Sequence, residues 1–128
     1  MATEKIIRRL MLEPKKRMYT FFVNPELLEA MDEVIRKYGH KSRGNYIRTL
    51  LFNFTMDYIH GDINKKLPKL PESSAVKDRA IPVLMKDVEI ELLFDFTKKY
   101  KFGYRSEFIR YLIIRNLKKN RLWNTSAT

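Results

Sequence analysis

A repeated phrase constrains the fold of this chain more than any other feature of its sequence. Residues 42–51 read SRGNYIRTLL, and residues 104–113 read YRSEFIRYLI. Arg43, Ile47, Arg48 and Leu50 recur 62 positions later as Arg105, Ile109, Arg110 and Leu112. Glu29, Lys37 and Tyr38 recur at the same offset as Glu91, Lys99 and Tyr100. Because a solenoid needs about three repeats or more, two copies indicate a duplicated unit.

The first copy of the phrase follows a stretch that predicts a strand and a helix. Residues 17–23, RMYTFFV, are rich in the aromatic and β-branched side chains typical of strands. We expect Asn24 to cap a helix, with Pro25 in its first turn and Gly39 at its end. The apolar residues of this helix recur at helical spacing and form one face: Leu27, Leu28, Met31, Val34, Ile35 and Tyr38. A second helix is predicted after the turn at 40–43. Its apolar face comprises Tyr46, Ile47, Leu50, Leu51, Phe54 and Tyr58.

The same order of elements is predicted around the second copy. Residues 79–85, RAIPVLM, predict a strand despite Pro82, which an edge strand tolerates. We expect Asp87 to cap a helix that runs to about Tyr100, and Ser106 to cap the last helix. The apolar faces of these two helices comprise Val88, Leu92, Leu93, Phe96 and Tyr100, then Phe108, Ile109, Leu112 and Ile113.

The sequence therefore predicts two copies, at residues 17–60 and 79–120, with three further segments around them. Residues 1–16 hold a short docking helix at 4–12 and the start of a basic arm, Lys15, Lys16 and Arg17. Residues 61–78 are polar with two prolines, as in a linker, and residues 121–128 form a tail. The sequence has no cysteine and no apolar run near the ~20 residues of a membrane span, and we expect its first residues not to be a signal peptide. We therefore expect a cytoplasmic protein.

One strand with two helices, about 45 residues, is too small to bury its apolar faces alone. Its single strand would also leave a row of backbone N–H and C=O groups without partners. Pairing of the two copies removes both difficulties, because the strands then form a ribbon over the interlocked helices. The expected fold is mainly α, with a short two-stranded antiparallel ribbon.

The charge and the polar residues favour a binding protein over an enzyme. The 26 Lys and Arg exceed the 15 Asp and Glu, which gives a net charge of +11. Such an excess favours an anionic partner, most often nucleic acid, although it also serves solubility alone. His40 and His60 have no metal-ligand spacing, and the sequence shows no catalytic triad or phosphate-binding glycine loop. We expect no catalysis, no metal and no cofactor.

In this order of elements the sequence resembles the ribbon-helix-helix family of DNA-binding proteins (the Arc and MetJ type), with two tandem copies in one chain. The stretches that carry the resemblance are FFVNPELLEAMDEV and YGHKSRGNYIRTLL in the first copy and KFGYRSEFIRYLI in the second. The resemblance implies an intramolecular pseudo-dimer that regulates transcription on double-stranded DNA and self-associates there. Tandem copies are similar to small regulators of archaeal viruses, which would place the protein in a host cytoplasm. A structural nucleoprotein that coats DNA with little sequence preference is the alternative.

In that family the ribbon enters the major groove, and alternate strand side chains read the base edges. The resemblance assigns this role to Met18, Thr20, Phe22, Ala80, Pro82 and Leu84. It turns Tyr19, Phe21, Val23, Ile81, Val83 and Met85 to the core. Of the six readers only Thr20 has a side chain that can form a hydrogen bond, which departs from the family. A ribbon buried in a protein interface is therefore an open alternative; otherwise recognition depends on flanking Lys16, Arg17 and Arg79 and on DNA shape.

The resemblance also implies that the start of each second helix grips the DNA backbone beside the ribbon. The residues at these starts are Arg43, Gly44 and Asn45 in the first copy and Arg105, Ser106 and Glu107 in the second. Simple solvated turns are the alternative for the two arginines. Arg48 and Arg110 are expected at the surface or between subunits. Because Gly44 differs from Ser106, and Thr20 from Pro82, the two ends of the ribbon should not bind alike.

Overall fold

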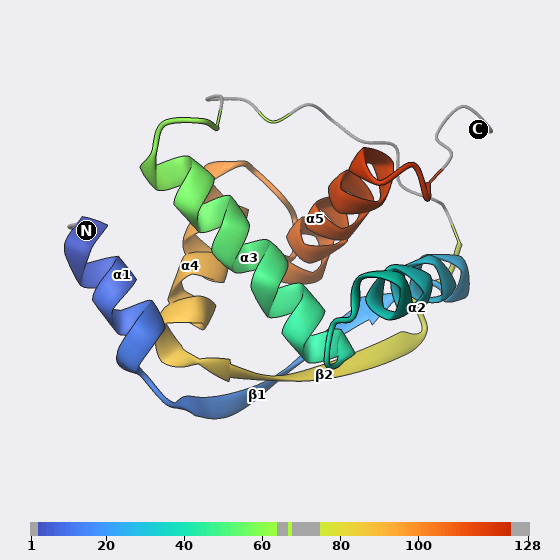
Figure 1. Ribbon diagram of the computed structural model, residues 1–128, viewed down its shortest axis with the longest axis horizontal. Helices are drawn as coiled ribbons and strands as arrows, with labels where there is room; N and C mark the ends of the chain where they lie inside the picture. Colours follow the sequence, from blue (N-terminus) through green and yellow to red (C-terminus); the bar gives the residue numbers. More distant parts are fainter. Residues whose placement is uncertain (1–2, 64–66, 68–74, 124–128) are drawn as a thin grey trace.

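The helices of the protein lie on one side of a two-stranded ribbon, which forms the lower edge of the molecule in Figure 1. The computed structural model describes residues 3–63, 67 and 75–123. The described elements are α1 (Thr3–Leu12), β1 (Lys15–Val23), α2 (Pro25–Tyr38), α3 (Arg43–Ile59), β2 (Arg79–Lys86), α4 (Asp87–Lys99) and α5 (Arg105–Lys119). This confirms the mainly helical class and the strand–helix–helix order of each copy. Most of the expected linker and tail lies outside the described residues.

The two strands pair with each other in antiparallel orientation within the one chain. Thr20 lies opposite Pro82 at the centre of the register, and these two residues are related by the offset of the repeat. The ladder has one irregularity, between Lys15 and Arg17. β1 begins at Lys15, so the prediction of a separate basic arm before residue 17 is wrong, because the chain there already pairs with the end of β2.

One face of the ribbon is buried and the other is open, as the alternation of its side chains predicts. The buried side chains are Phe21, Val23, Ile81, Val83 and Met85, and Tyr19 is half-buried. The exposed side chains are Met18, Thr20, Phe22, Ala80, Pro82 and Leu84. The expected inward and outward sets are therefore confirmed, with Tyr19 less deeply buried than the rest of the inward set.

The core joins the two copies to each other. The second helix of each copy packs on the strand of the other, α3 on β2 and α5 on β1. Between α3 and α5, the Tyr46 hydroxyl donates a hydrogen bond to Asn116 Oδ1 at 2.7 Å. The Phe54 ring meets the edges of Phe96 and Phe108, with ring centroids 4.9 and 5.4 Å apart. Neither copy thus has a complete core of its own.

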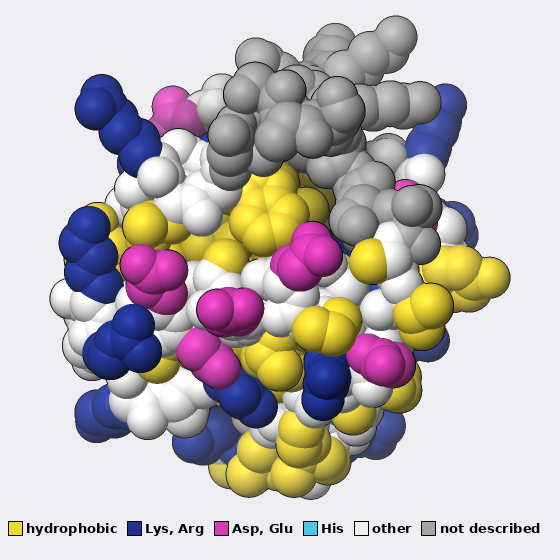
Figure 2. Space-filling model, turned by 90° about the vertical axis from the view of Figure 1, so that its right-hand side faces the viewer, with side chains coloured by type: hydrophobic (Ala, Val, Ile, Leu, Met, Phe, Trp, Pro, Cys, Tyr) yellow, Lys and Arg dark blue, Asp and Glu magenta, His cyan; other side chains and the backbone are white. Residues whose placement is uncertain are grey.

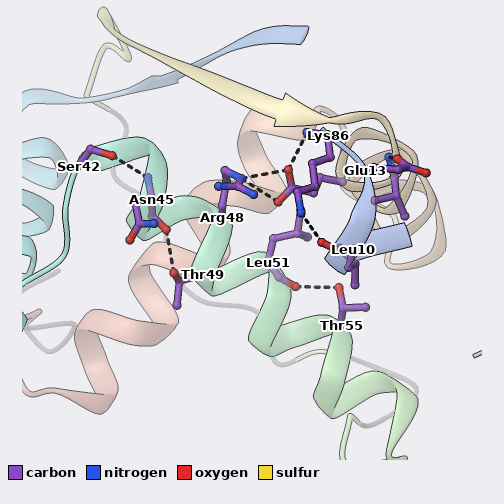
Figure 3. A network of polar contacts seen from close by, with 11 residues as sticks. Leu10, Glu13, Ser42, Asn45, Arg48, Thr49, Leu51, Thr55 and Lys86 are labelled. Atoms are coloured by element: carbon purple, nitrogen blue, oxygen red, sulfur yellow. Dashed lines mark hydrogen bonds and ion pairs between the residues drawn. The ribbon is translucent and has the colours of Figure 1, made fainter. Parts of the chain in front are cut away.

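The starts of the helices in the first copy differ in part from the predicted ones. Asn24 precedes α2, but its side chain makes no cap bond, and its Nδ2 is buried without a partner among the described residues. Gly39 ends α2 in the left-handed conformation at φ 71°, as expected. Ser42, which the sequence placed in a turn, caps α3 by accepting a 3.0 Å hydrogen bond from the Asn45 N–H (Figure 3).

In the second copy, both predicted caps are wrong by one or two residues. The cap position of α4 is Lys86 rather than Asp87, and the Lys86 N–H donates to the Glu89 carboxylate at 2.7 Å. Ser106 lies inside α5, whose cap position is Tyr104. In both places a polar residue lies in the first turn of the helix, where its sequence signal resembles that of a cap.

The N-terminal helix docks on α4; the sequence predicted a docking helix but not the element on which it docks. Leu10 is buried in the core, and Arg9 pairs with both Glu13 and Glu91. The Val88 N–H at the start of α4 donates to Glu13 Oε1 at 3.0 Å, so the residue that follows α1 supplies a cap for the first turn of α4. The hydrogen bonds from Arg9 lower the pKa of both carboxyl groups below their usual range.

Candidate nucleic-acid interface

The outward side of the ribbon presents a mainly apolar surface to solvent. We call it the ribbon face; it comprises Met18, Thr20, Phe22, Ala80, Pro82 and Leu84. The side chains of Met18, Phe22 and Leu84 are 62%, 45% and 42% exposed, although they are large and hydrophobic. Figure 2 shows hydrophobic side chains gathered at the lower edge of the molecule, where the ribbon lies. Such side chains can contact a thymine methyl group, and Thr20 alone adds a hydrogen-bonding side chain.

Three of the basic residues at the two ends of the ribbon, Lys16, Arg17 and Arg79, have an acidic partner. Lys16 Nζ and Arg17 Nε lie 4.0 and 3.1 Å from the carboxylate of Asp87. At the other end, Arg79 Nε lies 3.6 Å from Asp78 Oδ1. Each of these pairs is an exposed single contact worth about 0–1 kcal/mol, so a phosphate group can compete for these cations more readily than for a two-pronged pair. The structure thus places the three flanking residues beside the ribbon face, as the sequence predicts.

The start of each second helix contacts one strand of the ribbon. At α3, a Cβ atom added to Gly44 would lie 3.4 Å from Val83 Cγ1 on β2. At α5, the Phe22 N–H on the open edge of β1 donates to Ser106 Oγ at 3.3 Å. Because the first N–H groups of a helix lack partners within it, both starts can bind an anion next to the ribbon. The hydroxyl of Ser106 is not a helix cap but a link to the strand.

The two helix-start arginines make different contacts. Arg43 forms a two-pronged ion pair with Asp32, with Nε–Oδ1 at 2.9 Å and Nη2–Oδ2 at 2.8 Å. The hydrogen bonds from Asp32 raise the pKa of Arg43. The Arg105 guanidinium instead stacks on aromatic rings, 3.8 Å from the centroid of Phe94 and 5.1 Å from that of Tyr19. Neither arginine is therefore a simply solvated turn residue, which was the alternative that the sequence left open for both.

A groove of about 710 Å³ runs along the outer edge of β1, beside Arg105. Phe22, Phe94 and Tyr104 supply aromatic walls, and Ser106 lies at the start of α5. Tyr104 is 76% exposed, so its ring is available to a ligand. The basic side chains of this groove suit a phosphate group, and its aromatic walls offer apolar surface beside it.

Arg48 and Arg110 tie the copies together and do not reach the ribbon face. Arg48 Nε lies 3.0 and 2.9 Å from the two carboxylate oxygens of Glu89, which is 4% exposed (Figure 3). Arg110 Nη1 donates to the Phe22 carbonyl at 2.8 Å and is buried. Of the two expected positions, at the surface or in a pair between subunits, the second fits both arginines, because each contacts the other copy. The repeat held a signal for this, because Glu89 corresponds to the core residue Leu27.

Comparison with known proteins identifies no relative of the chain. No family model matches it, and no curated protein or solved structure is significantly similar to it. Within residues 3–63, 67 and 75–123, no helix is both long and apolar enough to cross a membrane. The same residues contain no group of three or more His, Cys, Asp or Glu side chains that could hold a metal ion. The ribbon and the two helix starts are therefore the features that bear on function.

Proposed function

We propose that the protein regulates transcription by inserting its ribbon into the major groove of double-stranded DNA. The observation that carries this proposal is the open ribbon face with a helix start against each of its two strands. A two-stranded ribbon fits the major groove, and the helix starts beside it would then reach the flanking phosphates. The net charge of +11 supports attraction to a polyanion.

In this proposal the two copies act as an intramolecular pseudo-dimer of the ribbon-helix-helix type. Two features support it: the related residues Thr20 and Pro82 lie opposite each other, and each second helix packs on the strand of the other copy. A pseudo-dimer of unequal copies can recognise an asymmetric DNA site, whereas a homodimer favours a symmetric pair of half-sites. We further propose that chains associate on DNA to fill successive sites.

A second function, a structural nucleoprotein with little sequence preference, is favoured by one specific observation. Five of the six side chains on the ribbon face are apolar or prolyl, so few of them can form hydrogen bonds with base edges. In that case binding would depend on phosphate contacts, which fix position and affinity without reading sequence.

Footprinting on a genomic DNA library at about 0.15 M salt distinguishes these functions. A regulator protects discrete sites, whereas a coating protein protects the DNA uniformly. Absence of any protection would contradict both and favour the remaining alternative, a ribbon face that is covered by another protein. Sedimentation of the protein alone provides the control, because a ribbon buried between chains would give oligomers without DNA.

A further inference from the structure

The repeat relates two pairs of residues that make opposite kinds of contact. Asp32 and Arg43 in the first copy correspond to Phe94 and Arg105 in the second, at the common offset of 62. Each pair joins the first helix of its copy to the start of the second helix. In the first copy the contact is a two-pronged ion pair, and in the second it is a stacked guanidinium and ring. The two ends of the ribbon therefore differ at the position closest to the expected phosphate.

At the first end, Asp32 occupies the guanidinium group of Arg43. Two hydrogen bonds of 2.9 and 2.8 Å match the planar fork of an arginine to both carboxylate oxygens. A phosphate group would have to displace this carboxylate, or else approach an arginine whose positive charge the carboxylate already balances. Asp32 is thus an internal competitor of the DNA backbone.

At the second end, Arg105 keeps its positive charge. Its ring contacts are with Phe94 and Tyr19, and no carboxylate of the described residues lies within ion-pair distance of it. Stacking on Phe94 holds the guanidinium plane in place, so less conformational entropy is lost when its N–H groups bind an anion. The aromatic rings position this cation without neutralising it.

The grooves beside α2 and α4 also differ in charge, although Arg105 lines the α4 groove and Arg43 does not line the α2 groove. The groove over α2 is lined by three acidic residues, Glu29, Asp32 and Glu33, and two basic ones, Arg36 and Arg79. The related groove beside α4 is lined by one acidic residue, Asp95, and two basic ones, Lys98 and Arg105. Figure 2, which faces the α2 side of the molecule, shows acidic side chains mixed with basic ones there. The α4 groove is therefore the better environment for a phosphate group.

We propose that the DNA backbone is bound mainly at the Arg105 end of the ribbon, and that Asp32 suppresses binding at the Arg43 end. This inference rests on the proposed DNA-binding function and adds that the two ends of the ribbon bind phosphate groups unequally. A phosphate contacts Arg105, and the adjoining sugar packs against the exposed rings of Phe94 and Tyr104. The complex then has one strong and one weak set of backbone contacts, on either side of the bases that the ribbon face touches.

The test compares the salt dependence of binding in three variants. The probe is a mixed-sequence DNA duplex of three helical turns, about 30 base pairs, titrated by fluorescence anisotropy over a range of salt. The slope of log K against log salt is negative. Arg105→Ala should reduce its magnitude by about 1, the value for one lost phosphate contact. Arg43→Ala should leave the slope unchanged, because its charge is already balanced. Asp32→Asn should increase the magnitude of the slope by about 1, because it frees Arg43 to bind a phosphate.

The Asp32→Asn variant keeps the test decisive even if Arg105→Ala unfolds, because it predicts a gain of binding that a folding defect cannot mimic. Thermal unfolding of each variant checks that the fold is retained. Equal losses in Arg43→Ala and Arg105→Ala, or no gain in Asp32→Asn, would overturn the inference while leaving the DNA-binding function in place. Failure of the wild-type protein to bind the duplex would overturn both.

Discussion

Thr20 and Pro82 lie opposite each other at the centre of the ribbon, although the repeat makes them equivalent residues. The Phe22 N–H points to the open edge of β1, where it bonds Ser106, so by alternation the Thr20 N–H points to that edge too. Pro82, directly opposite, would then have its missing N–H at the open edge of β2. The proline therefore costs no bond of the ladder, and the copies have diverged at a position that keeps the pairing intact.

This central pair yields a prediction about sequence preference. Thr20 supplies the hydrogen-bonding side chain of the ribbon face, so Thr20→Ala should change which DNA sites are preferred. Binding to non-specific DNA should stay the same, because that depends on phosphate contacts. Selection of sites from a random DNA pool by both proteins measures the change. Identical selected sites would show that Thr20 does not read a base.

The buried ion pair between Arg48 and Glu89 yields a prediction about stability. Arg48→Ala leaves the Glu89 carboxylate buried without its cation, which should lower the free energy of unfolding by about 3–5 kcal/mol. Urea denaturation followed by circular dichroism measures the loss. Arg43→Ala is the matched control, because its pair with Asp32 is exposed and should cost about 0–1 kcal/mol. Similar losses in the two variants would contradict the distinction between a buried and an exposed pair.

The double variant Arg48→Met with Glu89→Leu extends this prediction. It restores at residue 89 the leucine that the first copy carries at Leu27, and it removes both buried charges together. Because the desolvation of both ions is avoided, we expect it to recover most of the stability that Arg48→Ala loses. A double variant as unstable as the single one would show that the carboxylate is needed for its hydrogen bond to the Lys86 N–H.

The sequence predicted the parts of the fold that depend on local periodicity. Alternating side chains indicated which residues of β1 and β2 face the core, and the turn at Gly39 followed from the glycine itself. The contacts of Arg43 could not be predicted in this way, because Asp32 lies on another helix and nothing local marks it as a partner. The caps of α4 and α5 were misplaced because Asp87 and Ser106 are polar residues of the first turn.

Gly44 gives a prediction about the stability of the fold. It lies in the first turn of α3, and an added Cβ would meet Val83 Cγ1 at 3.4 Å, which is close to ordinary contact. Gly44→Ala should therefore raise the free energy of unfolding by about 0.5–1 kcal/mol, because glycine loses more conformational entropy in a helix. Thermal denaturation measures this gain. A loss of stability would mean that Val83 cannot yield the few tenths of an ångström required.

Ser106→Ala is the matched change in the second copy, where the related residue already carries a Cβ atom. It removes the hydroxyl that accepts from the Phe22 N–H at the edge of β1. Because this bond is exposed and long, we expect a loss of about 0.5–1 kcal/mol at most. Opposite signs for Gly44→Ala and Ser106→Ala in the same denaturation experiment would support the different contacts of the two helix starts.

The docking of α1 on α4 should make stability depend on pH in the acid range. The hydrogen bonds of Arg9 lower the pKa of Glu13 and Glu91 from the usual 4.5 in the folded protein. Their contribution is therefore fully present above the unfolded pKa, and it is lost as the pH falls through the lower, folded pKa. Both carboxyl groups are partly exposed, so solvent screening keeps the effect small. Arg9→Met should lower stability at neutral pH and flatten its decline below about pH 4.5, measured by urea denaturation across that range. An unchanged pH profile in Arg9→Met would show that these two carboxyl groups are not held by Arg9 in solution.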